Sequence, residues 1–190
     1  SSKKIKLYRK NSMSINNLNS LLKNTKSKKI PSKFRSILKK NLGEIRINWP
    51  KNLPKGIIHG DLFIDNIFFD KKKFAGFIDF YFSCNDYLMY EIAISINALC
   101  FDKKRNKFFL NKKKVKNLIK GYQTIRKISE KEKNAVNILC RGAALRYLFT
   151  RTYDYFNTPK SALIKIKDPK EYYQKLLIHN NLKTYKNYLN

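Results

Sequence analysis

Cysteine, glycine and acidic residues are scarce in this sequence, and it contains no long apolar run. Its 190 residues include 3 Cys, 6 Gly and 13 Asp and Glu. Cys84, Cys100 and Cys140 are widely separated and form no C-x-x-C pair, which argues against a disulfide framework or zinc site and favours reduced thiols in the cytoplasm. No apolar run approaches the roughly 20 residues of a membrane-spanning helix, and no signal-peptide pattern is found, so we expect no membrane partner.

The shortage of acidic residues leaves a formal net charge of +29, a value that normally suggests nucleic-acid binding. The composition argues against that partner. Of the 42 basic residues, 34 are Lys and 8 are Arg, whereas bidentate recognition of phosphates or bases favours Arg. The Lys residues are scattered rather than gathered in one stripe, and they accompany 21 Asn and 21 Ile, as an AT-rich coding sequence produces. We therefore interpret them as a solvated surface and expect no nucleic-acid partner.

The most informative motif is HGDLFIDN at 59–66, followed by IDFYF at 78–82. Asp61 and Asn66 are five residues apart, as are the Asp and Asn of the kinase catalytic loop H-R-D-x-x-x-x-N. In that pattern the Asp accepts the proton of the substrate hydroxyl and the Asn holds Mg²⁺. Asp79 follows an apolar run at the place of a second metal-binding Asp. An isolated H-G-D turn is common, so the interpretation depends on all three side chains.

The residues around this motif predict how the three side chains converge. Residues 56–58 form a short apolar run that predicts a strand entering the site, and Gly60 permits a sharp turn beside Asp61. Residues 67–69 and 74–78 predict two strands joined by a polar turn. Such a hairpin would begin at Asn66 and end at Asp79, so that both oxygens meet at one magnesium site. We assign His59 a supporting role for the backbone of the loop.

The H-G-D loop resembles that of the aminoglycoside-phosphotransferase and choline-kinase superfamily. The stretches FYFSCND and RGAALRYLFTR are similar to the homoserine kinases of that superfamily, and the matched stretches cover most of residues 54–176. The resemblance implies a two-lobed, cytoplasmic kinase that uses ATP and Mg²⁺ to convert L-homoserine to O-phospho-L-homoserine for threonine biosynthesis. Asp61 would be the catalytic residue, and Asn66 and Asp79 would be the metal ligands.

The same resemblance places the H-G-D motif in the second half of a kinase, whereas here it begins at residue 59. No G-x-G-x-x-G occurs in the sequence. We therefore expect residues 1–190 to form one domain, the C-terminal lobe of a longer kinase whose N-terminal lobe is missing. Its parts would be a helical segment at 1–53, the catalytic loop and metal-binding hairpin at 54–82, and a helical substrate-side subdomain at 83–190. The isolated lobe is expected to be inactive.

Two other functions remain open. The acceptor could be choline, an aminoglycoside or another hydroxylated metabolite, which the same catalytic loop would serve. The chain could also be a non-catalytic binding lobe, because the phosphate-clamping Lys would belong to the missing half. A third possibility, a natural one-lobed protein, fits the resemblance less well.

The expected fold class is α+β and mostly helical. Helical spacing of apolar residues marks the segments 14–22, 34–43, 86–99, 115–126, 131–155 and 171–189, and the chain after Asp79 is expected to hold helices only. His179, in the last of these segments, is expected to be a surface or packing residue. Asp86 would either cap the start of its helix or bind substrate.

Three arginines in the segment 131–155 are candidates for binding a substrate carboxylate, since the guanidinium group offers a planar bidentate fork. Arg141, Arg146 and Arg151 are five residues apart, so on a helix each is rotated by about 140° from the next. All three cannot face one pocket. Arg141 and Arg146 are the candidates chosen here, with surface or interhelical ion pairs as the alternative.

Overall fold

The computed structural model describes residues 8–23, 30–159, 161, 163 and 166–190. Within these residues the fold is α+β, 56% helical, with three small two-stranded antiparallel sheets. The helices are α1 (Ile15–Lys23), α2 (Ser32–Ile47), α3 (Leu88–Leu99), α4 (Lys112–Gln123), α5 (Glu130–Asn157), α6 (Lys170–Asn181) and α7 (Lys186–Leu189). The strands are β1 (Lys55–Ile58), β2 (Ile67–Asp70), β3 (Lys73–Phe77), β4 (Cys84–Tyr87), β5 (Phe101–Lys104) and β6 (Lys107–Leu110).

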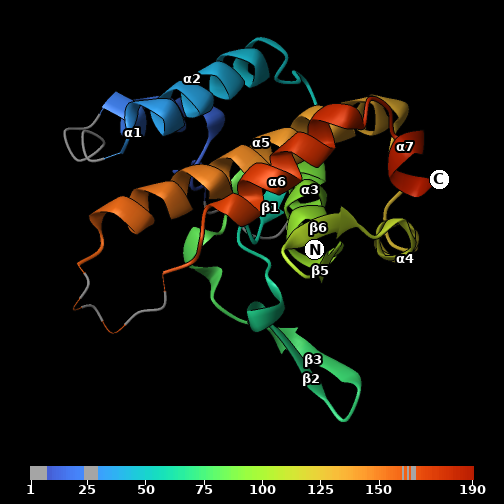
Figure 1. Ribbon diagram of the computed structural model, residues 1–190. Helices are drawn as coiled ribbons and strands as arrows, with labels where there is room; N and C mark the ends of the chain where they lie inside the picture. The colour runs from blue at the N-terminus through green and yellow to red at the C-terminus, as the bar shows by residue number, and fades with distance from the viewer. Residues whose placement is uncertain (1–7, 24–29, 160, 162, 164–165) are drawn as a thin grey trace.

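Helix α5 is the centre of the molecule. It runs across the structure with α2 along one side and α6 and α3 packed against it (Figure 1). Its start is fixed by a capping box, in which Ser129 Oγ accepts from the Glu132 N–H and Glu132 Oε2 accepts from the Ser129 N–H at 3.0 Å. Helix α3 is buried along most of its length, because it lies between β1 and α5. The core thus surrounds α3 and α5.

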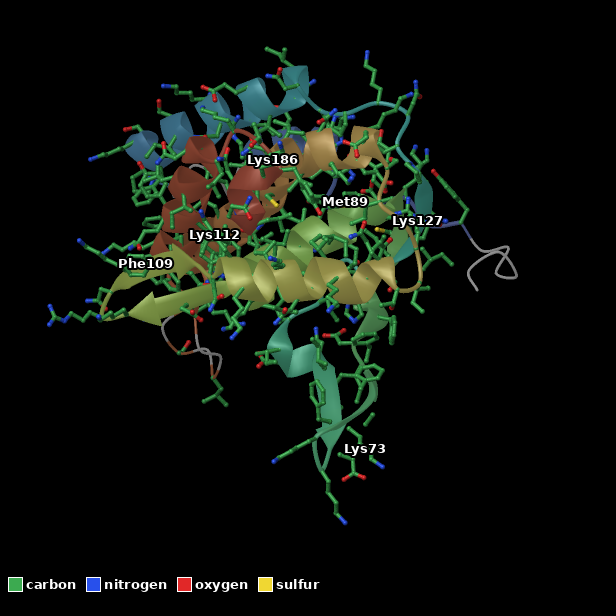
Figure 2. The ribbon with its side chains drawn as sticks, turned by 90° about the vertical axis from the view of Figure 1, so that its right-hand side faces the viewer. Lys73, Met89, Phe109, Lys112, Lys127 and Lys186 are labelled. Carbon is green, nitrogen blue, oxygen red and sulfur yellow. The ribbon has the colours of Figure 1, made fainter. Side chains whose placement is uncertain are left out.

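The predicted hairpin is present as β2 and β3. Figures 1 and 2 show it projecting from the helical body, with Lys73 near its tip. Lys71 and Lys72 form its turn, and both have positive φ (43° and 74°), as the two-residue turns that suit twisted hairpins require. The strands pair from Ile67 with Phe77 to Asp70 with Lys73. The hairpin therefore fixes where Asn66 and Asp79 stand relative to each other.

The expectation that only helices follow Asp79 is wrong. Strand β4 pairs antiparallel with β1, and β5 and β6 form a second hairpin. The turn of that hairpin contains Arg105, which has a positive φ of 53°. Four basic side chains near this turn obscure the two-residue alternation that usually identifies strands, so the sequence pattern predicted no sheet here.

Several helix limits also differ from the predictions. Helix α2 continues past Gly43 to Ile47, and α3 begins at Leu88 rather than at Asp86, which lies in β4. The predicted helix 115–126 is α4, which begins earlier, at Lys112, because Asn111 Oδ1 caps it by accepting from the Lys114 N–H at 3.0 Å.

The terminal helix predicted at 171–189 is two helices, α6 and α7. The side-chain amide of Asn137 donates to the carbonyls of His179 and Leu182, so it satisfies the end of α6 and stabilises the break. His179 lies just before this break and is fully buried, so it is a packing residue and not a surface one. Within the described part of the chain, none of the helices combines the length and apolar character that crossing a bilayer demands.

Candidate active site

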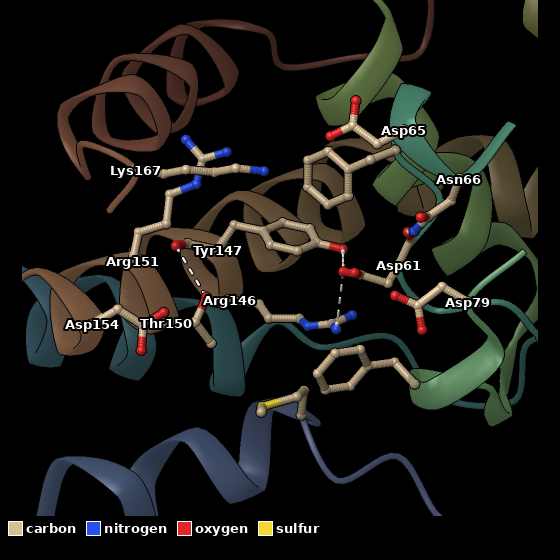
Figure 3. Close-up of a pocket in the computed structure, with 13 residues that line it drawn as sticks. Asp61, Asp65, Asn66, Asp79, Arg146, Tyr147, Thr150, Arg151, Asp154 and Lys167 are labelled. Atoms are coloured by element: carbon tan, nitrogen blue, oxygen red, sulfur yellow. Dashed lines mark hydrogen bonds and ion pairs between the residues drawn. The ribbon is translucent and has the colours of Figure 1, made fainter. Parts of the chain in front are cut away.

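A cavity of about 370 Å³ lies where the H-G-D loop, the base of the β2–β3 hairpin and helix α5 meet. Figure 3 shows four polar side chains of the loop and hairpin at one end of it, namely those of Asp61, Asp65, Asn66 and Asp79. The rest of its lining comes from Met13, Phe63, Phe82, Arg146, Tyr147, Thr150, Arg151, Asp154 and Lys167. The structure thus brings together the three side chains that the motif singled out.

Gly60 gives the loop its shape. Its φ is +77°, in the left-handed region, and a Cβ built there would lie 2.7 Å from the carbonyl oxygen of Phe82. No other residue fits such a position without strain. The Gly60 N–H donates to Glu91 Oε2 at 2.8 Å, so a carboxylate from α3 supports the turn from below. Burial raises the pKa of Glu91, and the bond from Gly60 opposes that rise.

His59 ties the two halves of the site together. Its Nδ1 accepts from the Asp61 N–H at 3.3 Å, and its Nε2 lies 2.8 Å from the carbonyl oxygen of Ile78, the residue before Asp79. With Nδ1 as acceptor, Nε2 carries the hydrogen and donates it to Ile78. The imidazole therefore bridges the backbone next to both aspartates, a geometry that suits the supporting role expected from the sequence.

Asn66 makes a second bridge between these segments. Its side-chain amide Nδ2 donates to the backbone carbonyl oxygen of Asp61 at 2.9 Å. The backbone carbonyl of Asn66 accepts from the Ile78 N–H at 3.1 Å. Because Nδ2 is engaged with the backbone of the loop, the amide oxygen is the atom left to face other ligands. Asn66 lines the same cavity as Asp61 and Asp79.

The Asp61 carboxylate is held from behind by two side chains of α5. Tyr147 donates its hydroxyl to Asp61 Oδ1 at 3.0 Å, and Arg146 Nη2 lies 3.7 Å from the same oxygen. Burial raises the pKa of Tyr147 well above its ordinary value, so its hydroxyl keeps its proton and remains a donor. Both contacts engage one carboxylate oxygen, and among the described residues Oδ2 has no hydrogen-bond donor.

Arg146 supports the loop as well as Asp61. It is almost fully buried, donates from Nη1 to the Gly60 carbonyl, and places its guanidinium group over the rings of Phe82 and Tyr147. This cation is thus committed to the loop, although it lines the cavity. Its contacts are those of a positioning residue rather than of the substrate-binding residue that the sequence suggested.

Asp79 has an unusual backbone. Its φ and ψ are 59° and 63°, in the left-handed region that few residues other than glycine and asparagine or aspartate adopt. Its Oδ1 accepts from the Tyr81 N–H at 3.4 Å, which turns the side chain toward the cavity. Such a conformation costs on the order of 1–3 kcal/mol and persists only where neighbouring structure enforces it. Here the neighbouring residue Ile78 is held on both sides, since its carbonyl accepts from His59 Nε2 and its N–H donates to the Asn66 backbone carbonyl.

Two of the residues proposed from sequence for substrate binding lie elsewhere. Arg141 Nη2 pairs with Glu44 of α2 at 2.9 Å and does not line the cavity. Asp86 accepts from Asn11 Nδ2 and from its own neighbour, the Tyr87 N–H, both at 2.7 Å, in a separate cavity. Asp86 lies in β4 and its side chain bonds to no amide inside α3, whose N-cap residue is Tyr87, so the structure does not support the capping interpretation either.

The sequence interpretation missed one face of α5. Tyr147, Thr150, Arg151 and Asp154 all line the cavity and follow the spacing i, i+3, i+4 and i+7, which places them on one side of a helix. That spacing was visible in the sequence and could have identified them. Lys167, which precedes α6, also lines the cavity, but no sequence signal indicates its approach.

Among the described residues, no group of three or more His, Cys, Asp or Glu side chains is arranged to hold a metal ion. Asp61, Asn66 and Asp79 do share the cavity, whose lining also includes Asp65 and Asp154. This donor set suits a hard cation that keeps some of its waters, such as Mg²⁺, rather than a structural zinc or iron site.

Comparison with known proteins identifies relatives of the chain. Residues 16–113 match the model of the phosphotransferase enzyme family. A homoserine kinase of Bartonella henselae is 43% identical over 178 residues, which are 93% of this chain and 55% of that protein. A homoserine kinase of Rhodospirillum rubrum is 44% identical over 77% of this chain, which corresponds to 44% of that protein. A homoserine kinase of Agrobacterium fabrum is 45% identical over 78% of this chain, which corresponds to 45% of that protein. The chain thus spans about half the length of these relatives.

Proposed function

The chain belongs to the phosphotransferase enzyme family, and from that premise we propose that it carries the hydroxyl-activating part of an ATP-dependent homoserine kinase. The reaction would convert L-homoserine to O-phospho-L-homoserine. The observation that carries the proposal is the cavity in which Asp61, Asn66 and Asp79 meet, because a kinase needs a proton acceptor and phosphate-side cation ligands within one small volume.

In this proposal Asp61 orients the acceptor hydroxyl and takes its proton. The oxygen of that hydroxyl forms a bond to the γ-phosphorus of ATP while the bond to the bridging oxygen breaks, and ADP leaves with the electron pair. Tyr147 and Arg146 hold Asp61 Oδ1, so Oδ2 is left to meet the hydroxyl. Since the side chain is about one-fifth exposed (22%), it is open to substrate but restricted in direction. Positioning of this kind is the main contribution expected of a protein to phosphoryl transfer.

Asn66 and Asp79 are the proposed ligands of Mg²⁺. The amide nitrogen of Asn66 is used by the loop, which leaves its oxygen as a ligand, and the left-handed backbone of Asp79 aims a carboxylate into the same cavity. Mg²⁺ commonly takes one or two such protein oxygens and fills its remaining positions with water and substrate phosphates. When bound, the ion would neutralise charge on the transferring phosphoryl group.

We propose homoserine rather than choline or an aminoglycoside as the acceptor. The relatives named above are homoserine kinases, and the cavity contains Arg151 and Lys167 in addition to its acidic residues. Cationic side chains would repel a quaternary ammonium group and attract a carboxylate. An acceptor with both charges therefore fits this lining best.

The chain is proposed to be the C-terminal lobe of a two-lobed kinase, in which a preceding lobe supplies the phosphate-clamping lysine. Support comes from the share of the relatives' length that it spans and from an apolar cluster on the hairpin. Phe68, Phe69, Phe74 and Phe77 are each 45–59% exposed there. So much adjacent aromatic surface normally marks an interaction site. On this view residues 1–53, 54–82 and 83–190 serve as the leading helices, the catalytic loop and hairpin, and the substrate side.

We also propose that the enzyme acts in the cytoplasm. Cys84, Cys100 and Cys140 are buried and unbridged, and burial raises the pKa of Cys84 to about 11 and that of Cys100 to about 12. Thiols of this kind are unreactive and are typical of a reducing compartment.

The test is phosphoryl transfer by the complete protein, including any lobe that precedes this chain. We expect Asp61→Ala to reduce kcat with L-homoserine by more than about a hundredfold while the protein stays folded, given the usual contribution of acid–base groups. Asp70→Ala, which removes an exposed carboxylate from the hairpin outside the cavity, is the control and should keep full activity. Activity of Asp61→Ala above a hundredth of wild type would contradict the assignment.

A further inference from the structure

The end of the cavity remote from Asp61 has no part in the phosphoryl-transfer chemistry described above. Figure 3 shows Arg151, Asp154 and Thr150 there, on α5, with Lys167 beside Arg151. These side chains carry opposite charges within one small lining. They therefore form a dipolar surface rather than a site of a single sign.

The spacing of Tyr147 and Arg151 along α5 is similar to the length of a small amino acid. Tyr147, which holds Asp61, is one helical turn before Arg151, so the two are separated by about 6 Å along the axis of α5. In extended homoserine, four single bonds separate the hydroxyl oxygen from the carboxylate carbon, a span of about 5 Å. A molecule of that size can place its hydroxyl at Asp61 and its carboxylate near Arg151.

Arg151 is held in place but not neutralised. Its Nη1 pairs with Glu171 Oε2 at 2.6 Å, and its guanidinium group lies 4.4 Å from the centre of the Tyr172 ring. The other oxygen of Glu171 pairs with Lys175, also at 2.6 Å. One carboxylate therefore serves two cations, so it does not fully neutralise Arg151. Among the described residues, Nη2 of Arg151 has no hydrogen-bond acceptor.

Asp154 and Lys167 are the other two charged side chains at this end of the cavity. No described side chain donates a hydrogen bond or an ion pair to the Asp154 carboxylate, and partial burial raises its pKa. Lys167 lies over the ring of Phe63 at 5.5 Å, and the described residues offer it no carboxylate partner. A cation arriving beside Asp154 and an anion arriving beside Arg151 and Lys167 would each gain a charged partner.

We propose that this end of the cavity is the recognition site for the charged groups of the acceptor amino acid. Arg151 and Lys167 bind its carboxylate, Asp154 binds its ammonium group, and the hydroxyl is thereby directed to Asp61. This inference rests on the proposed function and assigns substrate recognition to residues other than Arg141, Arg146 and Asp86. Opposite charges held one helical turn apart would also exclude amino alcohols that lack a carboxylate.

The experiment measures kcat and KM of the complete protein with MgATP and three acceptors: L-homoserine, 3-amino-1-propanol, which lacks the carboxylate, and 4-hydroxybutyrate, which lacks the ammonium group. Arg151→Gln should lower kcat/KM for L-homoserine by about 10- to 100-fold, mainly through KM, and leave 3-amino-1-propanol nearly unchanged. Asp154→Asn should lower kcat/KM for L-homoserine by a similar factor and leave kcat/KM for 4-hydroxybutyrate nearly unchanged. Where turnover of an analogue is slow, its inhibition constant replaces KM.

Arg141→Gln is the matched control, because Arg141 is on the same helix and also makes one ion pair, but outside the cavity. In this variant, kcat/KM for all three acceptors should stay within about twofold of the wild-type values. Should Arg151→Gln unfold the protein, Lys167→Met, which breaks no described ion pair, takes its place with the same expected pattern.

Three results would overturn the inference. One is an equal loss of kcat/KM for L-homoserine and for 3-amino-1-propanol in the Arg151 variant. Another is a loss of kcat/KM for L-homoserine in the Arg141 control as large as that in the Arg151 variant. The third is a wild-type protein that phosphorylates no amino acid, which would overturn the proposed function as well. If the wild type phosphorylates L-homoserine but the variants do not discriminate among the acceptors, the proposed function stands and only the recognition site is wrong.

Discussion

Acidification from pH 8 to pH 5 should destabilise the fold through His179, far from the catalytic loop. The imidazole is fully buried, with Nδ1 3.0 Å from the Tyr188 hydroxyl and Nε2 3.1 Å from Asn97 Oδ1. Since Asn97 Oδ1 can only accept, Nε2 carries the hydrogen, and Nδ1 accepts from Tyr188. Burial, reinforced by Lys175 and Arg141, lowers the pKa of His179 from 6.5 to about 3.

The sign of the effect follows from proton binding. The unfolded chain binds a proton at His179 as the pH falls through 6.5, whereas the folded chain does not until about pH 3. The stability that depends on the neutral ring is therefore fully present above pH 6.5 and is lost progressively between pH 6.5 and 3. At pH 5 the difference is about 1.5 pH units, or about 2 kcal/mol of unfolding free energy. That is a large part of the stability of a typical domain.

The assay is urea denaturation at pH 8, 6.5 and 5, followed by the fluorescence of Trp49, the single tryptophan of the chain, which packs against Tyr90. The control is His179→Gln, which leaves His59 as the remaining histidine. This variant should be less stable at pH 8 but should lose about 2 kcal/mol less than wild type on acidification to pH 5. Identical pH dependence in the two proteins would refute the reasoning, since all other titrating groups are common to both.

Two further predictions concern the site itself. Gly60→Ala should destabilise the protein by about 1–3 kcal/mol and abolish phosphoryl transfer, because its Cβ would lie 2.7 Å from the Phe82 carbonyl at a φ of +77°. Gly43→Ala is the control, because Gly43 lies within α2 and a Cβ built there would have no atom within 4 Å. This variant should instead stabilise the protein by up to about 1 kcal/mol. Equal melting temperatures for the two variants would contradict this prediction. Tyr147→Phe should lower kcat by about tenfold with the fold intact, since it removes the 3.0 Å hydrogen bond to Asp61 and retains the ring. Tyr172→Phe removes a buried hydroxyl that has no described partner, so equal kinetic losses in the two variants would show that the bond to Asp61 is irrelevant.

The end of the cavity that contains the H-G-D loop was predictable because its residues are close in sequence. Asp61, Asn66 and Asp79 lie on one loop and the hairpin that follows it, and the apolar runs on either side of the polar turn identify that hairpin. Local pattern was therefore enough to bring these side chains together. The left-handed backbone of Asp79, which follows the bonds of Ile78 with His59 and Asn66, was not predicted by any sequence pattern.

The other end was not predictable in the same way. The spacing of Arg141, Arg146 and Arg151 excludes a common direction for all three, but it does not say which of them faces the loop. That is decided by α2, whose Glu44 engages Arg141, and by α6, whose Glu171 engages Arg151. Both partners are distant in sequence, so only the packed structure distinguishes a recognition residue from an interhelical ion pair.

The most direct test of the central claim is to supply the complete wild-type protein with MgATP and L-homoserine and to follow the reaction by phosphorus NMR. The account predicts a new phosphomonoester signal coupled to the side-chain methylene of homoserine, formed in equal amount with ADP. Release of inorganic phosphate alone, with no phosphomonoester of homoserine, would contradict it.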